Sequence, residues 1–252
     1  TTDSLDTIGY FTSKYDDLER IFDIMRVHGN NFPISNNALT DPARQNKPAD
    51  RPWNIAFVKT HTWENAFNYA RDEILNFVKQ VSELSDANIE EAELPAEMKS
   101  SHDVHERIYD KTLSYYFQEE FKKPEHVSSV MNDIIVRGNK ISVKEYHYAL
   151  TEQEALIHTM EKFFEKYDVI ISLSTAGEAP LRDDVERPDP SLMWTLTHLP
   201  VISAPVFISP DGLPFGVQIT ARKYNDLLLF RFTDYLRGSG LIPEGVNPLA
   251  SV

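Results

Sequence analysis

The chain has 252 residues, and 25 Lys and Arg stand against 39 Asp and Glu, which gives a formal charge of −14. Hydrophobic residues make up 41%, enough for a real core, and we expect residues 1–252 to form a single domain. The acidic balance argues against nucleic acid and anionic membranes as partners, because both attract clustered Lys and Arg. There is no cysteine, which excludes disulfides and thiolate metal sites. A cytoplasmic protein is expected.

The first part of the chain predicts two helices separated by a polar stretch and a strand. A helix is expected from Tyr15 to His28, with Ser13 as its N-cap, because apolar residues recur there at helical spacing. The Asn- and Pro-rich stretch 29–52 is interpreted as a long surface loop or connector. The run Trp53–Val58 is typical of a strand. The apolar stripe that follows predicts a helix over Thr62–Leu84.

The middle of the chain predicts a short edge strand near Ile89–Leu94 and a helix over His105–Lys122. Ser142 and Glu145 match a capping box, in which each side chain binds a free backbone N–H of the other residue, and this predicts a helix start. A second match, Thr151 with Glu154, either starts another helix or lies inside one continuous helix that runs to Tyr167.

The last part of the chain predicts a buried strand and a hairpin. The β-branched run Asp168–Leu173 is typical of a buried strand. Val201–Ile208 and Phe215–Thr220 flank a Ser-Pro-Asp-Gly turn, which predicts an antiparallel hairpin. A final helix is expected over Asn225–Arg237. Strands that follow helices, together with a hairpin, indicate an α/β domain with a mixed sheet.

A search for catalytic patterns returns mostly negative results. The nine glycines form no phosphate-binding loop, and His102 and His105 lack the further ligands that a metal site needs. We therefore expect neither a metal nor a cofactor. The loop Ser174–Gly177 is more suggestive, because its small hydroxyl-bearing residues follow the buried strand. Ligands of open α/β sheets gather outside such strand ends, although an ordinary surface loop is the alternative.

Several motifs occur in a characteristic order in the C-terminal third. They are Asp168–Ser172, Gly177–Pro180, Asp189–Thr195 and the hairpin Leu199–Ile219, which contains Gly-Leu-Pro-x-Gly-x-Gln. This order and spacing resemble the C-terminal half of the amidase signature family, the Ser–cisSer–Lys amidases. The segment Ser4–Gly9 is similar to the part of the family that follows its catalytic core.

The resemblance implies an α/β/α sandwich around a large mixed sheet and the hydrolysis of carboxamides. In the family a serine attacks the carbonyl, a second serine on a cis peptide relays the proton, and a lysine acts as base. These residues lie upstream of the segment that matches Ser4–Gly9, and this sequence contains none of them. We therefore expect no catalytic residue in this chain, which would be inactive by itself. Its missing N-terminal catalytic portion is expected on the same polypeptide or on a partner chain.

The resemblance also suggests residues that bind substrate. Ser174, Thr175 and Gly177 follow the strand that faces the acyl side of the substrate in relatives, so we expect them to line the pocket for a small-molecule amide. Trp194 lies on the segment that leads into the hairpin and is a fourth candidate, for which core packing is the alternative.

Two other functions stay open at this point. The chain could be a glutaminase-type subunit of an amidotransferase, which shares the fold. It could also be a non-catalytic pseudoamidase that binds or scaffolds. Half a sandwich would leave one sheet edge and apolar helix surface unpaired, which is unfavourable for a free protein. A homodimer is also left open.

Overall fold

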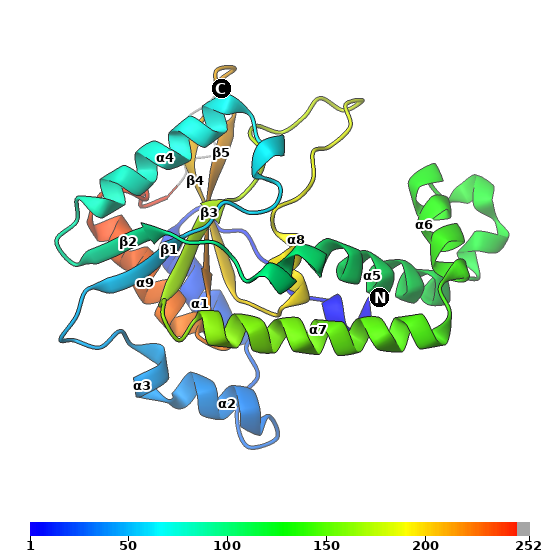
Figure 1. Cartoon of the computed structure of the whole chain (residues 1–252), viewed down its shortest axis with the longest axis horizontal. Coiled ribbons are helices and arrows are strands. Elements are labelled where there is room, and N and C mark those ends of the chain that lie inside the picture. Colours follow the sequence, from blue (N-terminus) through cyan, green and yellow to red (C-terminus); the bar gives the residue numbers. More distant parts are fainter. Residues whose placement is uncertain (246–252) are drawn as a thin grey trace. The chain divides into compact units, whose positions relative to one another are not determined.

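The computed structural model describes residues 1–245, and these cluster into two compact units. The helical unit contains Thr1–Ile8, Pro95–Lys162 and Leu192–His198, and the sheet unit contains Gly9–Leu94, Phe163–Ser191 and the described residues 199–245. Figure 1 shows the elements in the order of the sequence. Residues 246–252 of the predicted single domain lie outside the described residues.

The helical unit is built mainly from α5 (Ser101–Tyr116), α6 (Ser129–Lys140), α7 (Val143–Phe163) and the short α8 (Leu192–Leu196). Helices α5 and α6 are joined by a bidentate salt bridge, in which Arg137 Nε and Nη2 donate to the Asp110 carboxylate at 2.7 and 3.0 Å. No helix within residues 1–245 is both long enough and apolar enough to cross a membrane.

The predicted capping box at the start of α7 is confirmed. The Ser142 N–H donates to Glu145 Oε2 at 2.8 Å, and the Glu145 N–H donates to Ser142 Oγ at 3.2 Å. The second match lies inside the same continuous helix, where the Thr151 hydroxyl donates to the carbonyl of His147. Thr151 therefore caps no separate helix.

The sheet unit contains a mixed five-stranded sheet in the order β2-β1-β3-β5-β4. The strand β1 (Trp53–Phe57) runs parallel to both β2 (Ala87–Glu91) and β3 (Val169–Leu173). The hairpin of β4 (Val201–Ile208) and β5 (Pro214–Ala221) is antiparallel, and β5 also pairs antiparallel with β3. The hairpin, the strands β1 and β3 and the α/β class with a mixed sheet are therefore confirmed. The predicted edge strand Ile89–Leu94 is present as β2, but β2 begins two residues earlier and ends three residues earlier.

One face of this sheet carries the main core of the unit. Side chains from all five strands pack there against two helices, α4 (Asn68–Ser82) and α9 (Asp226–Gly238), and those of the edge strand β2, Ala87 and Ile89, are half-buried. Their contacts include the edge-to-face packing of Trp53 on Phe232 and of Phe77 on Phe207. Because register partners share a face, the alternating apolar residues of β1, β3 and β5 form one continuous layer.

The structure departs from prediction in the stretch 29–52, which contains two helices, α2 (Pro33–Thr40) and α3 (Pro42–Gln45), in place of a long loop. The physical reason is that a proline occupies the first position of each helix, where its missing N–H costs nothing. The buried Gln45 side chain accepts from the N–H groups of Leu227 and Leu228 and thereby caps α9. This part of the chain is therefore anchored to the last helix.

The first helix also differs in detail. The helix α1 (Tyr15–Met25) ends three residues before the predicted end, and its N-cap is Lys14 in place of the predicted Ser13. Its buried residue is Tyr15, whose hydroxyl donates to the carbonyl of Phe230 at 2.6 Å and so ties α1 to α9.

Candidate functional site

The candidate site lies where two parallel strands end side by side. β1 and β3 are parallel neighbours, so the loops that follow their carboxyl ends lie at the same edge of the sheet. The two loops are joined by a hydrogen bond, because the Phe67 N–H donates to the carbonyl of Ala176 at 2.9 Å. The Val58 N–H extends the pairing by donating to the carbonyl of Ile171 at 3.0 Å.

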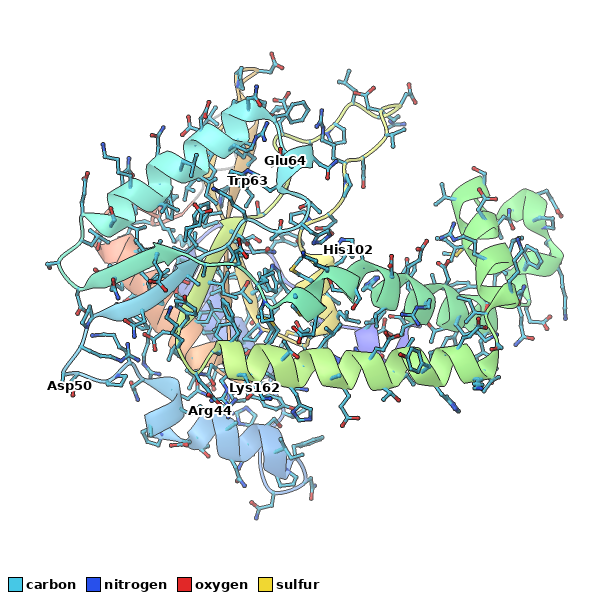
Figure 2. All side chains as sticks on the ribbon, viewed as in Figure 1. Arg44, Asp50, Trp63, Glu64, His102 and Lys162 are labelled. Carbon is cyan, nitrogen blue, oxygen red and sulfur yellow. The ribbon has the colours of Figure 1, made fainter. Side chains whose placement is uncertain are left out.

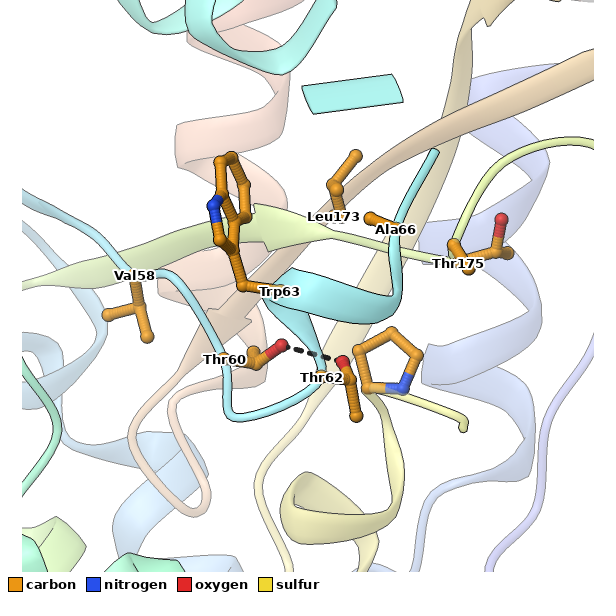
Figure 3. Close-up of a pocket in the computed structure, with 9 residues that line it drawn as sticks. Val58, Thr60, Thr62, Trp63, Ala66, Leu173 and Thr175 are labelled. Carbon is orange, nitrogen blue, oxygen red and sulfur yellow. Dashed lines mark hydrogen bonds between the residues drawn. The ribbon is translucent and has the colours of Figure 1, made fainter. Parts of the chain in front are cut away.

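A small pocket lies between these loops (Figure 3), with a cavity volume of about 10 Å³, which is room for about one water molecule. Its walls are apolar side chains and three threonines, and all nine residues belong to the sheet unit. They are Val58, Thr60, Thr62, Trp63, Ala66, Leu173, Thr175, Ala176 and Pro190.

The loop after β1 provides two hydroxyls and an aromatic ring. The hydroxyls of Thr60 and Thr62 lie 2.9 Å apart and share one hydrogen bond, and both residues are only 6% exposed. Trp63 begins the short 3-10 turn Trp63–Asn65 that precedes α4 (Figure 2) and packs edge-to-face on Phe57. The β1 loop therefore contributes the polar part of the pocket and one of its apolar walls.

The predicted residues of the β3 loop occupy different places around this pocket. Thr175 lines it, and its hydroxyl is engaged with the backbone of Gly177, to which it donates and from which it accepts. Ser174 donates its hydroxyl to the carbonyl of Gly216 at 2.8 Å, which fixes the loop to β5. The side chain of Thr175 therefore lies in the pocket wall, whereas that of Ser174 anchors the loop to β5.

Gly177 lies under an aromatic pair and does not itself line the pocket. A Cβ at this position would stand 2.4 Å from the Tyr69 hydroxyl and 2.7 Å from the Phe67 ring, so only glycine fits without movement. Phe67 and Tyr69 are stacked with an interplanar angle of 12°, and Tyr69 Oη accepts from the Glu178 N–H at 3.0 Å. Glycine therefore lets the loop pass beneath α4.

Trp194, the fourth candidate, belongs to the helical unit. It lies on α8, and its side chain is 1% exposed.

The segment 178–191 leaves the β3 loop and returns to the pocket wall at Pro190. At its start the Ser209 hydroxyl donates to the Glu178 carboxylate. Near its end the Arg187 guanidinium lies 3.8 Å from the centre of the Phe67 ring and donates to the carbonyl of Asn65. The segment is thus held at both ends, with exposed residues between them.

The side chains that line this pocket are all neutral. None of its nine lining residues carries an ionisable side chain, so the pocket offers no base and no charged group to stabilise an oxyanion. Hydroxyls, an indole ring and aliphatic side chains can hold an uncharged ligand.

Sequence reasoning missed Thr60, Thr62 and Trp63. The signal that could have found them is the strand Trp53–Val58 followed directly by a helix. A strand followed by a helix is half of a parallel βαβ unit, so its loop falls at the same sheet edge as Ser174–Gly177.

The chain is similar in sequence and in fold to several known proteins. The chain is 23% identical over 106 residues to a component of the glutamyl-tRNA(Gln) amidotransferase of Brachyspira hyodysenteriae, which is 38% of this chain and 22% of that component. The fold matches an inhibitor-bound structure from a vestigial complex related to an s-triazine catabolic enzyme, with a TM-score of 0.73 and 18% identity over 92% of this chain and 53% of that one. It also matches 6-aminohexanoate cyclic dimer hydrolase, with a TM-score of 0.70 and 14% identity over 91% of this chain and 53% of that one.

The chain therefore spans about half the length of these two solved proteins. The model of the family described as Amidase matches residues 1–230, which include every strand of the sheet. This chain belongs to the amidase family.

Proposed function

We propose that the protein hydrolyses the carbon–nitrogen bond of a small-molecule amide, and that this chain forms part of the substrate pocket. The observation that carries the proposal is the family match over residues 1–230 together with a strand-end pocket lined by neutral hydroxyl and apolar groups. A neutral carboxamide can accept and donate hydrogen bonds there without the desolvation cost of a charge.

The reactive groups are proposed to lie outside residues 1–252. Supporting this, the sequence contains no segment that resembles the family's serine- and glycine-rich catalytic loop, and the pocket offers no ionisable side chain. The chain also covers only 53% of the hydrolase whose fold it shares. Acyl transfer needs a nucleophile, a base and oriented donors, and a second stretch of polypeptide would supply them.

A second candidate function is that of one component of an amidotransferase. It is favoured by the sequence similarity to the glutamyl-tRNA(Gln) amidotransferase component. In that case the amide would be the side chain of glutamine, and a partner polypeptide would receive the ammonia. Substrate choice separates the two functions, because a hydrolase releases ammonia from simple amides without a partner.

The test compares the 252-residue chain with the product of the complete gene. Both are purified and assayed for release of ammonia from glutamine and primary amides, and for release of the amine from secondary amides. We expect turnover by the longer product and none by the 252-residue chain. Turnover of a simple amide by the 252-residue chain would refute the location of the reactive groups.

Two further outcomes decide between the remaining functions. Turnover restricted to glutamine would favour the amidotransferase function. If the complete gene product folds but turns over no amide, the protein is a pseudoamidase that binds without cleaving.

A further inference from the structure

Residues 178–191 form a strap of the sheet unit that contains no helix or strand, and 179–189 are all exposed (the yellow-green loop in Figure 1). Both ends of the strap are anchored to the β4–β5 hairpin. At one end the Ser209 hydroxyl donates to the Glu178 carboxylate, and at the other Gln218 Nε2 donates to Ser191 Oγ at 3.1 Å. These two bonds fix where the strap begins and ends.

Between its anchors the strap is fastened to the loop after β1 through Arg187. The Arg187 guanidinium lies 3.8 Å from the centre of the Phe67 ring and donates to the carbonyl of Asn65. In the part of the chain that the structure describes, side chains 181–186 form no hydrogen bond, ion pair or ring contact with other segments. The position of the strap between its anchors therefore depends on Arg187.

The same aromatic stack holds the strap at two points. Phe67, which carries the Arg187 guanidinium, is stacked on Tyr69, and Tyr69 Oη accepts from the Glu178 N–H at 3.0 Å. If Arg187 leaves Phe67, Glu178 stays bound to Tyr69 and to Ser209. The first residue of the strap can then act as a hinge.

The fastened strap closes one wall of the small pocket at the ends of β1 and β3. Pro190, near the end of the strap, and Ala66, next to Phe67, both line that pocket, and both are buried. The cavity volume of about 10 Å³ is room for about one water molecule. A group larger than water can reach this cavity only when its walls separate.

The fastening is weak. A cation over the ring of a surface residue and a single hydrogen bond each contribute little to stability, and the exposed residues 179–189 bury little apolar area. Segments with few buried contacts open at free energies well below that of global unfolding. The strap should therefore open and close while the rest of the sheet unit stays folded.

We propose that the strap is a lid: residues 179–190 open as a unit about Glu178 and Ser191 when Arg187 leaves Phe67, and this opening exposes the pocket wall at Ala66. The inference goes beyond the proposed function, because it concerns a motion of this chain and holds whether or not the complete protein cleaves an amide.

The test measures thiol labelling of the 252-residue chain, which has no cysteine of its own. Ala66→Cys places a reporter thiol in the pocket wall, at a position that is 5% exposed. Its rate of reaction with iodoacetamide, followed by mass spectrometry, reports the open population when closing is faster than labelling. We expect Arg187→Ala to raise this rate about three- to tenfold, because it removes the ring contact and the hydrogen bond to Asn65.

A second reporter separates opening of the strap from a loss of overall stability. Ala70 lies further along α4, is 0% exposed and does not line the pocket. Arg187→Ala should change the labelling rate of Ala70→Cys less than twofold. Equal acceleration at both reporters, or none at Ala66→Cys, would overturn the proposal. If Ala66→Cys shows no cooperative unfolding in urea, Thr62→Cys takes its place, because Thr62 lines the same pocket and is 6% exposed.

Two variants of the strap itself test the fastening. Arg187→Lys keeps a cation that can lie over the Phe67 ring, so its labelling rate should fall between those of the unchanged strap and Arg187→Ala. Arg182→Ala removes a charge from the same strap and should leave the rate unchanged. If Arg182→Ala accelerates labelling as much as Arg187→Ala does, the charge of the strap controls its position in place of the fastening, and the proposal fails.

Discussion

Replacing Gly177 by alanine should destabilise the sheet unit by about 2–4 kcal/mol. The backbone at this position has φ +156°, and the new Cβ would stand 2.4 Å from the Tyr69 hydroxyl. The strained backbone costs about 1 kcal/mol. Displacing Tyr69 also breaks its hydrogen bond with the Glu178 N–H, worth about 1 kcal/mol, and disturbs its stacking on Phe67, worth about 0.5–1.5 kcal/mol.

The assay is urea unfolding, and a second glycine separates the two contributions. Gly212 in the hairpin turn also has positive φ, at +83°, but no atom lies within 4 Å of a Cβ placed there. Gly212→Ala therefore measures the backbone cost alone, and we expect about 1 kcal/mol. Combining Gly177→Ala with Tyr69→Phe removes the atom that clashes first, so the double variant should lose less than the sum of the two single losses. Equal losses for the two glycine variants, or strict additivity in the double variant, would refute the packing argument.

Three further predictions concern charges in the sheet unit. Arg51→Ala should cost about 2–3 kcal/mol in urea unfolding, because it leaves the nearly buried Asp168 carboxylate without the guanidinium that binds it at 2.6 and 2.7 Å. Burial raises the pKa of Asp226 from 3.8 to about 6, so the folded state holds this proton more tightly and stability should fall as pH rises from about 4 to 6. Asp226→Asn should abolish that fall and gain at most about 3 kcal/mol at pH 8. Arg187→Ala should speed proteinase K cleavage of segment 178–191 about two- to fivefold, since it removes the contact with Phe67.

Each of these predictions has a matched control. Arg20 makes an exposed ion pair with Asp17, so Arg20→Ala should cost less than about 0.5 kcal/mol, and an equal cost for Arg51→Ala would contradict the buried-pair argument. Arg182 lies on the same segment as Arg187. Equal cleavage rates for Arg182→Ala and Arg187→Ala would show that Arg187 does not hold the segment in place. An unchanged pH slope in Asp226→Asn would assign that slope to another group.

The confirmed parts of the fold depend on local signals that tertiary contacts reinforce. The capping box of Ser142 and Glu145 and the β-branched run of β3 each specify one structure through neighbouring residues, so both could be predicted. In the stretch 29–52 prolines indicate helix breakers, yet Pro33 and Pro42 occupy first helical positions. The burial of Gln45 against α9 favours the helices over a loop in this stretch. This contact spans about 180 residues of sequence, so no local pattern reveals it.

The candidate site could be predicted only in part for a similar reason. The β3 loop stands out in the sequence because hydroxyl residues follow a strand, and Thr175 does line the pocket. Thr60 and Thr62, which also line the pocket, can be predicted only once β1 is known to lie parallel and adjacent to β3. The role of Gly177 depends on where the Tyr69 ring packs, which is a tertiary fact.

The most direct measurement labels the complete gene product with a fluorophosphonate, which reacts with activated serines, and maps the modified peptide by mass spectrometry. We predict one labelled serine that lies outside residues 1–252, and protection of that serine when propionamide is present. A label on any serine within residues 1–252, such as Ser174 or Ser191, would contradict the assignment of this chain to the pocket wall.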